Sequence, residues 1–171
     1  MYRRILLVSD GTRESLTALR EGALIARAFQ AQAYVLIIDL QTVGKFMATS
    51  TYLSPQDSTY LSDLLKLGLS RLRRLRVVAS GEVARGEATR LICETERNFK
   101  PDLVVVGYRR TGILQRWWSG NAGAPLADAL KCGVLLVREK ITDEEFDEYI
   151  LGQRGTRWQR ESESGLRLPL E

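Results

Sequence analysis

Apolar residues form short runs and helical stripes that alternate along residues 1–138. Short apolar runs bounded by polar or turn-forming residues are typical of buried strands. The run DLVVV ahead of Gly107 is unbroken, which favours a strand buried on both faces. The pattern predicts five strands: Arg4–Ser9, Ala33–Leu40, Val77–Val83, Asp102–Val106 and Gly133–Arg138.

Apolar residues at helical spacing occupy the intervals between these strands. In the first interval Leu16, Leu19, Ala23 and Ala26 lie three or four residues apart, and Thr12 stands where a side chain can cap the helix. The stripes predict four helices: Arg13 to about Gln30, Leu61–Arg76, Glu87–Phe99 and Asn121–Lys131.

The alternation of strands and helices predicts an α/β fold. We expect residues 1–139 to form a single domain, an open five-stranded parallel sheet with helices on both faces. Residues 140–171 read as an acidic C-terminal extension, a short helix followed by a flexible tail. Within it, Thr142 and Glu145 have the spacing of a capping box.

Composition excludes several kinds of chemistry. The chain has no histidine, which removes imidazole bases, triads built on them and most zinc sites. Cys93 and Cys132 lack a CxxC partner, and we interpret them as two buried thiols. No apolar run approaches the roughly 18–20 residues that cross a bilayer, and the N-terminus is unlike a secretory leader. We therefore expect a cytoplasmic protein without a membrane span.

Charge is distributed unevenly along the chain. Residues 1–137 carry 19 Lys/Arg against 12 Asp/Glu, whereas residues 138–171 carry 6 against 9. A basic body suits an anionic partner such as a nucleotide or nucleic acid. The basic run Arg71–Arg76 keeps its leucines at helical spacing, and no aromatic-and-basic signature accompanies it. We interpret this run as a solvated helix face and expect no nucleic-acid partner.

A candidate ligand site follows if the first and fourth predicted strands are neighbours in the sheet. Ligands of open parallel sheets bind beyond the carboxyl ends of the strands, where the strand order reverses. The first strand ends at Asp10-Gly11 and the fourth at Gly107. Gly120 and Asn121 open the fourth helix, whose free N–H groups and positive dipole end attract a phosphate. The loop between them carries no P-loop motif.

The segments RRILLVSDGTRES, PDLVVVGYRRTG, WSGN and CGVLLVRE resemble the universal stress protein family, of the adenine nucleotide alpha hydrolase-like superfamily. The resemblance covers about residues 2–139. It implies the strand order 3-2-1-4-5, which places the first and fourth strands side by side. It also implies an adenine nucleotide as ligand, with Asp10 at the end of the first strand and the backbone of Ile37 near the adenine.

Nucleotide-binding members of this family carry a G-x2-G-x9-G-[ST] motif, which this sequence matches in part. Gly107 and Gly120 match the first and third glycines, but Arg110 stands at the second and Asn121 at the hydroxyl position. Gly112 replaces the missing glycine if the loop is shifted, and Ala122, next after Asn121, also lacks a hydroxyl.

These departures leave two interpretations open. Either the phosphate site is degraded, because the Arg110 side chain blocks a close backbone approach, or it is rebuilt. In the rebuilt site Arg109 and Arg110 would supply charge-assisted bonds to phosphate from outside the loop. We interpret the preceding pair Trp117-Trp118 as packing residues. Because adjacent residues on a helix point in different directions, one of the two rings can be exposed to a partner.

The resemblance implies a regulatory module that binds ATP, ADP or AMP. Mg²⁺ can accompany the nucleotide, and we assign no metal ligands in the chain. Any ATP hydrolysis would be slow, because the sequence offers no evident metal cage or catalytic base. The resemblance also implies a homodimer formed through the last strand, and an unknown protein partner. The alternative is a dimeric stress-response module that has lost nucleotide binding and acts through partner contacts.

Overall fold

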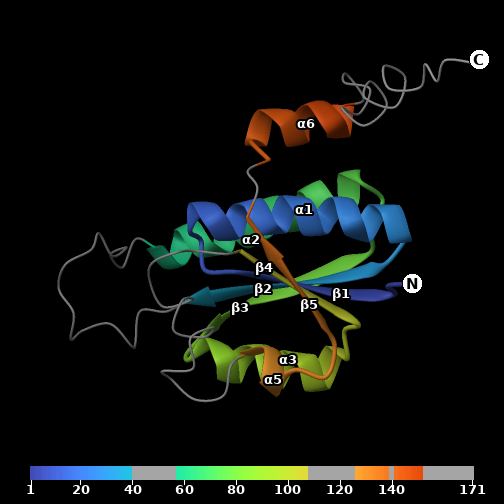
Figure 1. Cartoon of the computed structure of the whole chain (residues 1–171). Coiled ribbons are helices and arrows are strands. Elements are labelled where there is room, and N and C mark those ends of the chain that lie inside the picture. Colours follow the sequence, from blue (N-terminus) through green and yellow to red (C-terminus); the bar gives the residue numbers. More distant parts are fainter. Residues whose placement is uncertain (40–56, 108–125, 139–140, 152–171) are drawn as a thin grey trace, which may run out of the picture. The chain divides into compact units, whose positions relative to one another are not determined.

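The computed structural model describes residues 1–39, 57–107, 126–138 and 141–151. Within Met1–Lys140 it forms a five-stranded parallel sheet in the order β3-β2-β1-β4-β5 (Figure 1). The predicted fold class and strand order are confirmed. The elements of this unit are β1 (Arg4–Ser9), α1 (Arg13–Phe29), β2 (Gln32–Asp39), α2 (Asp57–Arg74), β3 (Ala79–Arg85), α3 (Ala88–Phe99), β4 (Leu103–Gly107), α5 (Leu126–Ala129) and β5 (Gly133–Val137).

The central strand β1 marks the point where the order of strands reverses. The chain adds β2 and β3 on one side of β1 and then returns to add β4 and β5 on the other. Leu7 pairs with Val35 of β2 and with Val105 of β4, so both neighbours run parallel to β1. The carboxyl ends of β1 and β4 therefore meet at one edge, as the family resemblance implied.

Helices cover both faces of the sheet, with α1 and α2 on one face and α3 and α5 on the other (Figure 1). The strands supply alternate residues to each face, because side chains along a strand point in opposite directions in turn. One buried core cluster on the α3 face joins three strands and two helices: Leu6, Val8, Leu36, Ile38, Val104, Val106, Ala88, Ile92, Leu126 and Leu130.

On the opposite face, α2 approaches the sheet closely over β3. A Cβ atom at Gly81 would collide with the carbonyl oxygen of Val35 and lie 3.0 Å from Leu65 of α2. The absent side chain is therefore what allows this close contact between β3, β2 and the helix.

The predicted boundaries are right for β1 and shifted for several other elements. β3 was expected at Val77–Val83 but spans Ala79–Arg85. Arg76 adopts a left-handed φ of 60°, and Val77 donates its N–H to Leu72 O (2.9 Å), so Val77 belongs to the connection after α2. β3 extends to Arg85 because Arg85 still pairs with Asp39 of β2.

Two predicted helices also differ from the structure. α2 begins at Asp57 rather than Leu61, because its first turn is polar and carries no apolar stripe. Of the predicted helix Asn121–Lys131, the described part is helical at Leu126–Ala129, and residues 121–125 lie outside the described residues.

The second unit, Ile141–Glu171, contains α6 (Asp143–Leu151). Its N-terminus has the predicted capping box. Glu145 donates its N–H to Thr142 Oγ1, and Thr142 donates its N–H to Glu145 Oε2, both at 3.1 Å. No helix in the part of the chain that the structure describes is both long and apolar enough to cross a membrane.

Candidate functional site

Asp10 lies in the turn between β1 and α1, where Thr12 holds one of its carboxylate oxygens. Thr12 donates both its backbone N–H (3.1 Å) and its hydroxyl (2.6 Å) to Asp10 Oδ1. Among the described residues, no hydrogen bond engages Oδ2, and the side chain is partly exposed. Thr12 thus fixes the orientation of the carboxylate, and no described residue competes with a ligand for Oδ2.

This arrangement corrects the expected helix cap. Thr12 occupies the N-cap position of α1 with extended backbone angles, but its side chain makes no capping hydrogen bond. In a cap the hydroxyl oxygen accepts an N–H of the first helical turn, whereas here the hydroxyl is directed to the carboxylate of Asp10 and donates a charge-assisted hydrogen bond to it. Thr12 is the N-cap residue, as predicted, but its side chain binds Asp10 and not the first turn of the helix.

Two serines complete the turn. Ser9 and Ser15 join their hydroxyls at 2.8 Å, and the Ser15 hydroxyl also donates to the Thr12 carbonyl at 2.9 Å. The N–H groups of Asp10 and Gly11 donate to the Ser15 and Ser9 hydroxyls at 3.3 and 3.1 Å. Because these two N–H groups are satisfied within the turn, they orient Asp10 and are not available to a phosphate.

Gly107 is buried at the carboxyl end of β4, where it pairs with Val137 of β5. The β1–β4 register sets Leu7 opposite Val105. Continued by two residues, the same register brings Gly107 opposite Ser9, the residue that precedes Asp10. The structure therefore brings Asp10, Gly11 and Gly107 to one edge of the sheet.

Ile37 lies one strand away and is fully buried in β2, paired with Ser9 and Val83. Ala33 donates its N–H to the Val78 carbonyl, and Asp39 O accepts from Gly86 on the same side. Alternate residues of a parallel strand direct their backbone groups to the same neighbour, so those of Ile37 point toward β3. A ligand hydrogen bond from this backbone would have to replace a pairing with β3.

The structure adds a residue that the sequence pattern did not single out. Tyr60, in the first turns of α2, donates its hydroxyl to the Gly11 carbonyl at 3.4 Å. Tyr60 is 43% exposed. Tyr60 and Gly11 are 49 positions apart, and no local signal in the sequence connects them.

Asp39 ends β2 and is buried at this same sheet edge. Arg85 places Nε and a terminal guanidinium nitrogen on Asp39 Oδ2, each at 2.9 Å, and Arg85 itself is largely exposed. This pairing ties the ends of β2 and β3 together.

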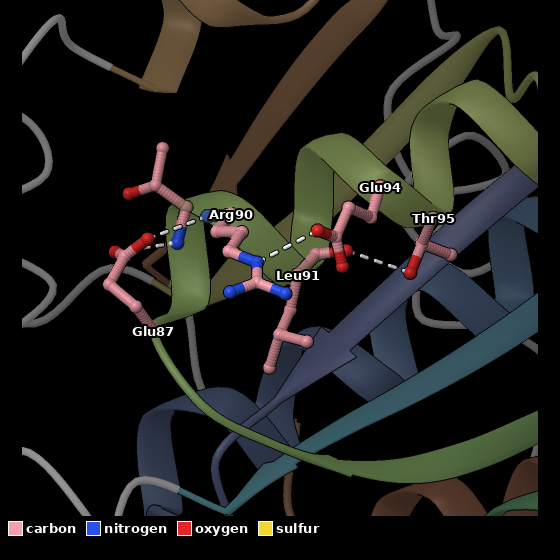
Figure 2. A network of polar contacts seen from close by, with 6 residues as sticks. Glu87, Arg90, Leu91, Glu94 and Thr95 are labelled. Carbon is pink, nitrogen blue, oxygen red and sulfur yellow. Dashed lines mark hydrogen bonds and ion pairs between the residues drawn. The ribbon is translucent and has the colours of Figure 1, made fainter.

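The N-terminus of α3 is already occupied by a carboxylate of the chain, as Figure 2 shows. Glu87 caps the helix by accepting the N–H groups of Thr89 (2.9 Å) and Arg90 (2.7 Å). Burial acts to raise the pKa of Glu87, but these hydrogen bonds and the charge of Arg90 outweigh it and lower the pKa. A ligand phosphate at this helix end would have to displace the Glu87 side chain.

The remaining predicted site residues lie outside the described residues: Arg109, Arg110, Gly112, Gly120, Asn121 and Ala122, together with Trp117 and Trp118. The described residues contain no group of three or more His, Cys, Asp or Glu side chains that could hold a metal ion.

Both cysteines are free thiols, and each is only half-buried at the rim of the core cluster on the α3 face. The expectation of two buried thiols is thus right about the thiols and wrong about their full burial. Burial, followed by the nearby charge of Glu96, raises the pKa of Cys93 and Cys132.

An open parallel sheet with an aspartate and a glycine at its reversal point defines a doubly wound α/β protein. A family model described as the universal stress protein family matches residues 1–138. The chain belongs to the universal stress protein family.

A curated relative and several solved structures agree with this assignment. Universal stress protein MJ0531 of Methanocaldococcus jannaschii is 25% identical over 148 residues, which make up 81% of this chain and 84% of the relative.

The chain resembles a universal stress protein solved in complex with cAMP (21% identity, TM-score 0.58, covering 81% of this chain and 98% of that one). It also resembles a family member from Burkholderia pseudomallei (16% identity, TM-score 0.57, covering 81% of this chain and 97% of that one). A third similar structure is a family protein from Arabidopsis thaliana with AMP bound (17% identity, TM-score 0.55, covering 83% of this chain and 94% of that one). At these identities the similarity concerns the fold.

Proposed function

We propose that this protein is a cytoplasmic regulatory module that binds an adenine nucleotide at the crevice beyond the carboxyl ends of β1 and β4. ATP, ADP and AMP are the candidate ligands. In this proposal the protein senses nucleotide rather than turning it over rapidly, because the described residues provide neither a metal cage nor a histidine base.

The observation that carries the proposal is the geometry of Asp10. Oδ1 accepts two hydrogen bonds from Thr12, while Oδ2 makes none with the described residues. A carboxylate oxygen held in this way is a strong acceptor for a hydroxyl pair such as that of a ribose. We assign Asp10 this role, with Gly11 and Gly107 as the backbone on either side of the ligand and Ile37 in the floor beneath it.

The family's solved structures support the ligand class. One relative is described in complex with cAMP and another with AMP bound, and both share the fold. Adenine, ribose and one phosphate are common to these two ligands, so we extend that shared chemistry to this chain. ATP with Mg²⁺ is the larger ligand within the same proposal.

The phosphate end of the site is assigned to the segment after Gly107. We propose that Arg109 and Arg110 hold the phosphates by their side chains, with Gly112, Gly120, Asn121 and Ala122 forming the backbone around them. Guanidinium groups make paired, charge-assisted hydrogen bonds to phosphate oxygens, which compensates for the missing motif glycine.

A second candidate function is favoured by the same departures from the motif. If Arg110 blocks the phosphate, the protein is a dimeric stress-response module that acts through a protein partner without nucleotide. Replacing Arg110 by Gly separates the two: affinity for AMP falls if the arginine clamps the phosphate and rises if it blocks it.

We propose that the protein forms a homodimer through β5. This strand pairs only with β4 among the described strands and so lies at the edge of the sheet. Its residues Val134, Leu135 and Leu136 are apolar and half-buried. An apolar edge strand readily pairs with a second copy of itself.

The direct test is thermal unfolding with and without ATP, ADP and AMP. A ligand that binds only the folded protein raises the melting temperature by mass action. We expect a rise with at least one of the three nucleotides and its loss in Asp10→Ala. An unchanged melting temperature at millimolar concentrations of all three would reject nucleotide binding and leave the second candidate.

A further inference from the structure

A half-exposed aromatic ring stands beside the turn that carries Asp10. Tyr60 Cε1 lies 3.3 Å from the position that a Cβ atom of Gly11 would occupy. Its hydroxyl donates to the Gly11 carbonyl, and the residue is 43% exposed. Gly11 has a positive φ of 79°, so the backbone turns tightly at the point where the ring rests.

Packing of α2 against this turn does not explain the exposed ring. The neighbouring Leu61 places Cδ2 3.1 Å from the same position above Gly11 and is only 3% exposed. Leu61 therefore closes the space under the helix, and Tyr60 leaves a large aromatic surface in water. Burying such a surface would be favourable, which makes the ring a contact surface for another molecule.

The position of the ring matches one side of the proposed nucleotide site. Tyr60 is next to Gly11, which follows Asp10 directly, and it belongs to α2, the helix that packs over β2 and β3. In β2, Val35 faces α2 through Gly81, and Ile37 has the same orientation because alternate residues share a face. The ring thus stands on the β2 side of the crevice.

We propose that Tyr60 recognises the base of the bound nucleotide by packing its ring against the purine; this inference rests on the proposed function. Aromatic side chains bind bases in this way with little dependence on the base's hydrogen-bonding edge. Tyr60 thereby confers preference for a nucleotide over a sugar phosphate, while Asp10 binds the ribose common to both.

The test compares AMP with ribose 5-phosphate, which lacks the base, by calorimetric titration. Tyr60→Leu keeps an apolar side chain over Gly11 but removes the aromatic face, and Tyr60→Phe keeps the ring but removes the hydroxyl. We expect Tyr60→Leu to weaken the binding of AMP about tenfold, which corresponds to about 1.4 kcal/mol of binding free energy. Its affinity for ribose 5-phosphate should stay within about twofold of wild type, and Tyr60→Phe should bind both ligands as wild type does.

Leu67→Ala is the matched control, because Leu67 is a 48% exposed apolar residue on the same helix, seven positions further on. It should leave both affinities unchanged. Wild-type affinity for AMP in Tyr60→Leu, or an equal loss for both ligands, would overturn the role of Tyr60 and leave the proposed function standing. Failure of the wild-type protein to bind any of ATP, ADP, AMP and ribose 5-phosphate would instead overturn the proposed function and this inference with it.

Discussion

Thr12 binds a single oxygen of Asp10 through two donors, its N–H at 3.1 Å and its hydroxyl at 2.6 Å. Among the described residues, this pairing engages one oxygen of the carboxylate and leaves the other without a protein partner. In the proposed site Thr12 contacts no ligand; it positions Asp10, which does.

Replacing Thr12 by Val should therefore weaken nucleotide binding without removing any proposed ligand contact. The variant loses the 2.6 Å hydroxyl bond and leaves Asp10 freer to rotate. We expect about three- to tenfold weaker AMP binding and a fall of about 1–2 kcal/mol in the free energy of unfolding. Calorimetric titration and urea unfolding would measure the two effects.

Thr95→Val is the control for that experiment. Thr95 donates its hydroxyl to the Leu91 carbonyl at 2.8 Å on α3, as Figure 2 shows, so the same substitution removes one hydrogen bond elsewhere. It should lower stability and leave AMP affinity unchanged. Equal effects of both substitutions on affinity would show that Thr12 acts through general stability alone.

Adding one methyl group at Gly81 should destabilise the sheet. The new Cβ of Gly81→Ala would meet the Val35 carbonyl oxygen, which belongs to the backbone of a central strand and cannot move aside cheaply. We expect a loss of about 1–3 kcal/mol in the free energy of unfolding, the usual range for overpacking.

Gly68→Ala provides the opposite case. Gly68 lies within α2 and has no heavy atom within 4 Å of its potential Cβ. Since alanine is the better helix former, this variant should gain about 0.5–1 kcal/mol. Chemical denaturation of both variants measures the pair, and a Gly81→Ala protein as stable as wild type would contradict the packing described here.

Acidification should remove the contribution of Glu87 to stability. Its hydrogen bonds to α3 hold its pKa below the ordinary value, so the ionised form is favoured in the folded protein. A group with a lowered folded pKa stabilises the fold above its unfolded pKa, and that stability disappears as the pH falls through the folded pKa.

We therefore expect Glu87→Gln to be less stable than wild type near pH 7, by about 1 kcal/mol for a weakened helix cap. The difference should shrink as the pH falls below the ordinary range of glutamate. Urea unfolding at a series of pH values between about 3 and 7 would measure it. A difference that stays constant throughout would mean that the Glu87 charge has no part in the cap.

A charge on β5 should prevent the proposed dimer. Leu135 is half-buried on this edge strand, and lysine on an edge strand opposes pairing with another strand. We expect Leu135→Lys to sediment as a monomer. Val83→Lys places the same charge on β3, the opposite edge strand, where the side chain is 36% exposed, and should leave the assembly unchanged. If both variants sediment as the wild type does, β5 does not form the dimer interface.

The sequence pattern located most elements within a few residues, and its miss at the start of β3 has an identifiable cause. Val77 and Val78 are apolar and precede β3, yet they belong to a connection, because Arg76 turns the chain with a positive φ. A buried apolar connection and a buried strand have the same local pattern, since Val77 is only 7% exposed outside any strand. The pattern records burial and does not report which backbone partner is available.

The candidate site likewise combines residues that the sequence pattern could locate with contacts that it could not predict. Asp10 and Gly107 could be placed at strand ends from their flanking apolar runs, and their proximity was expected from the strand order that the family resemblance implied. The partner of the Thr12 hydroxyl could not be predicted, because a helix cap and a neighbouring carboxylate are both within reach of a threonine at that position.

By itself, the sequence determined the succession of strands and helices, the absence of imidazole chemistry and the residues at the ends of β1 and β4. These properties depend on composition and on periodicity over a few neighbouring residues. Only the tertiary structure decided that Thr12 holds Asp10, that Glu87 fills the N-terminus of α3 and that Tyr60 rests on Gly11. Such contacts depend on side-chain geometry and on how helices pack on the sheet, and residues 49 positions apart meet only when that packing is complete.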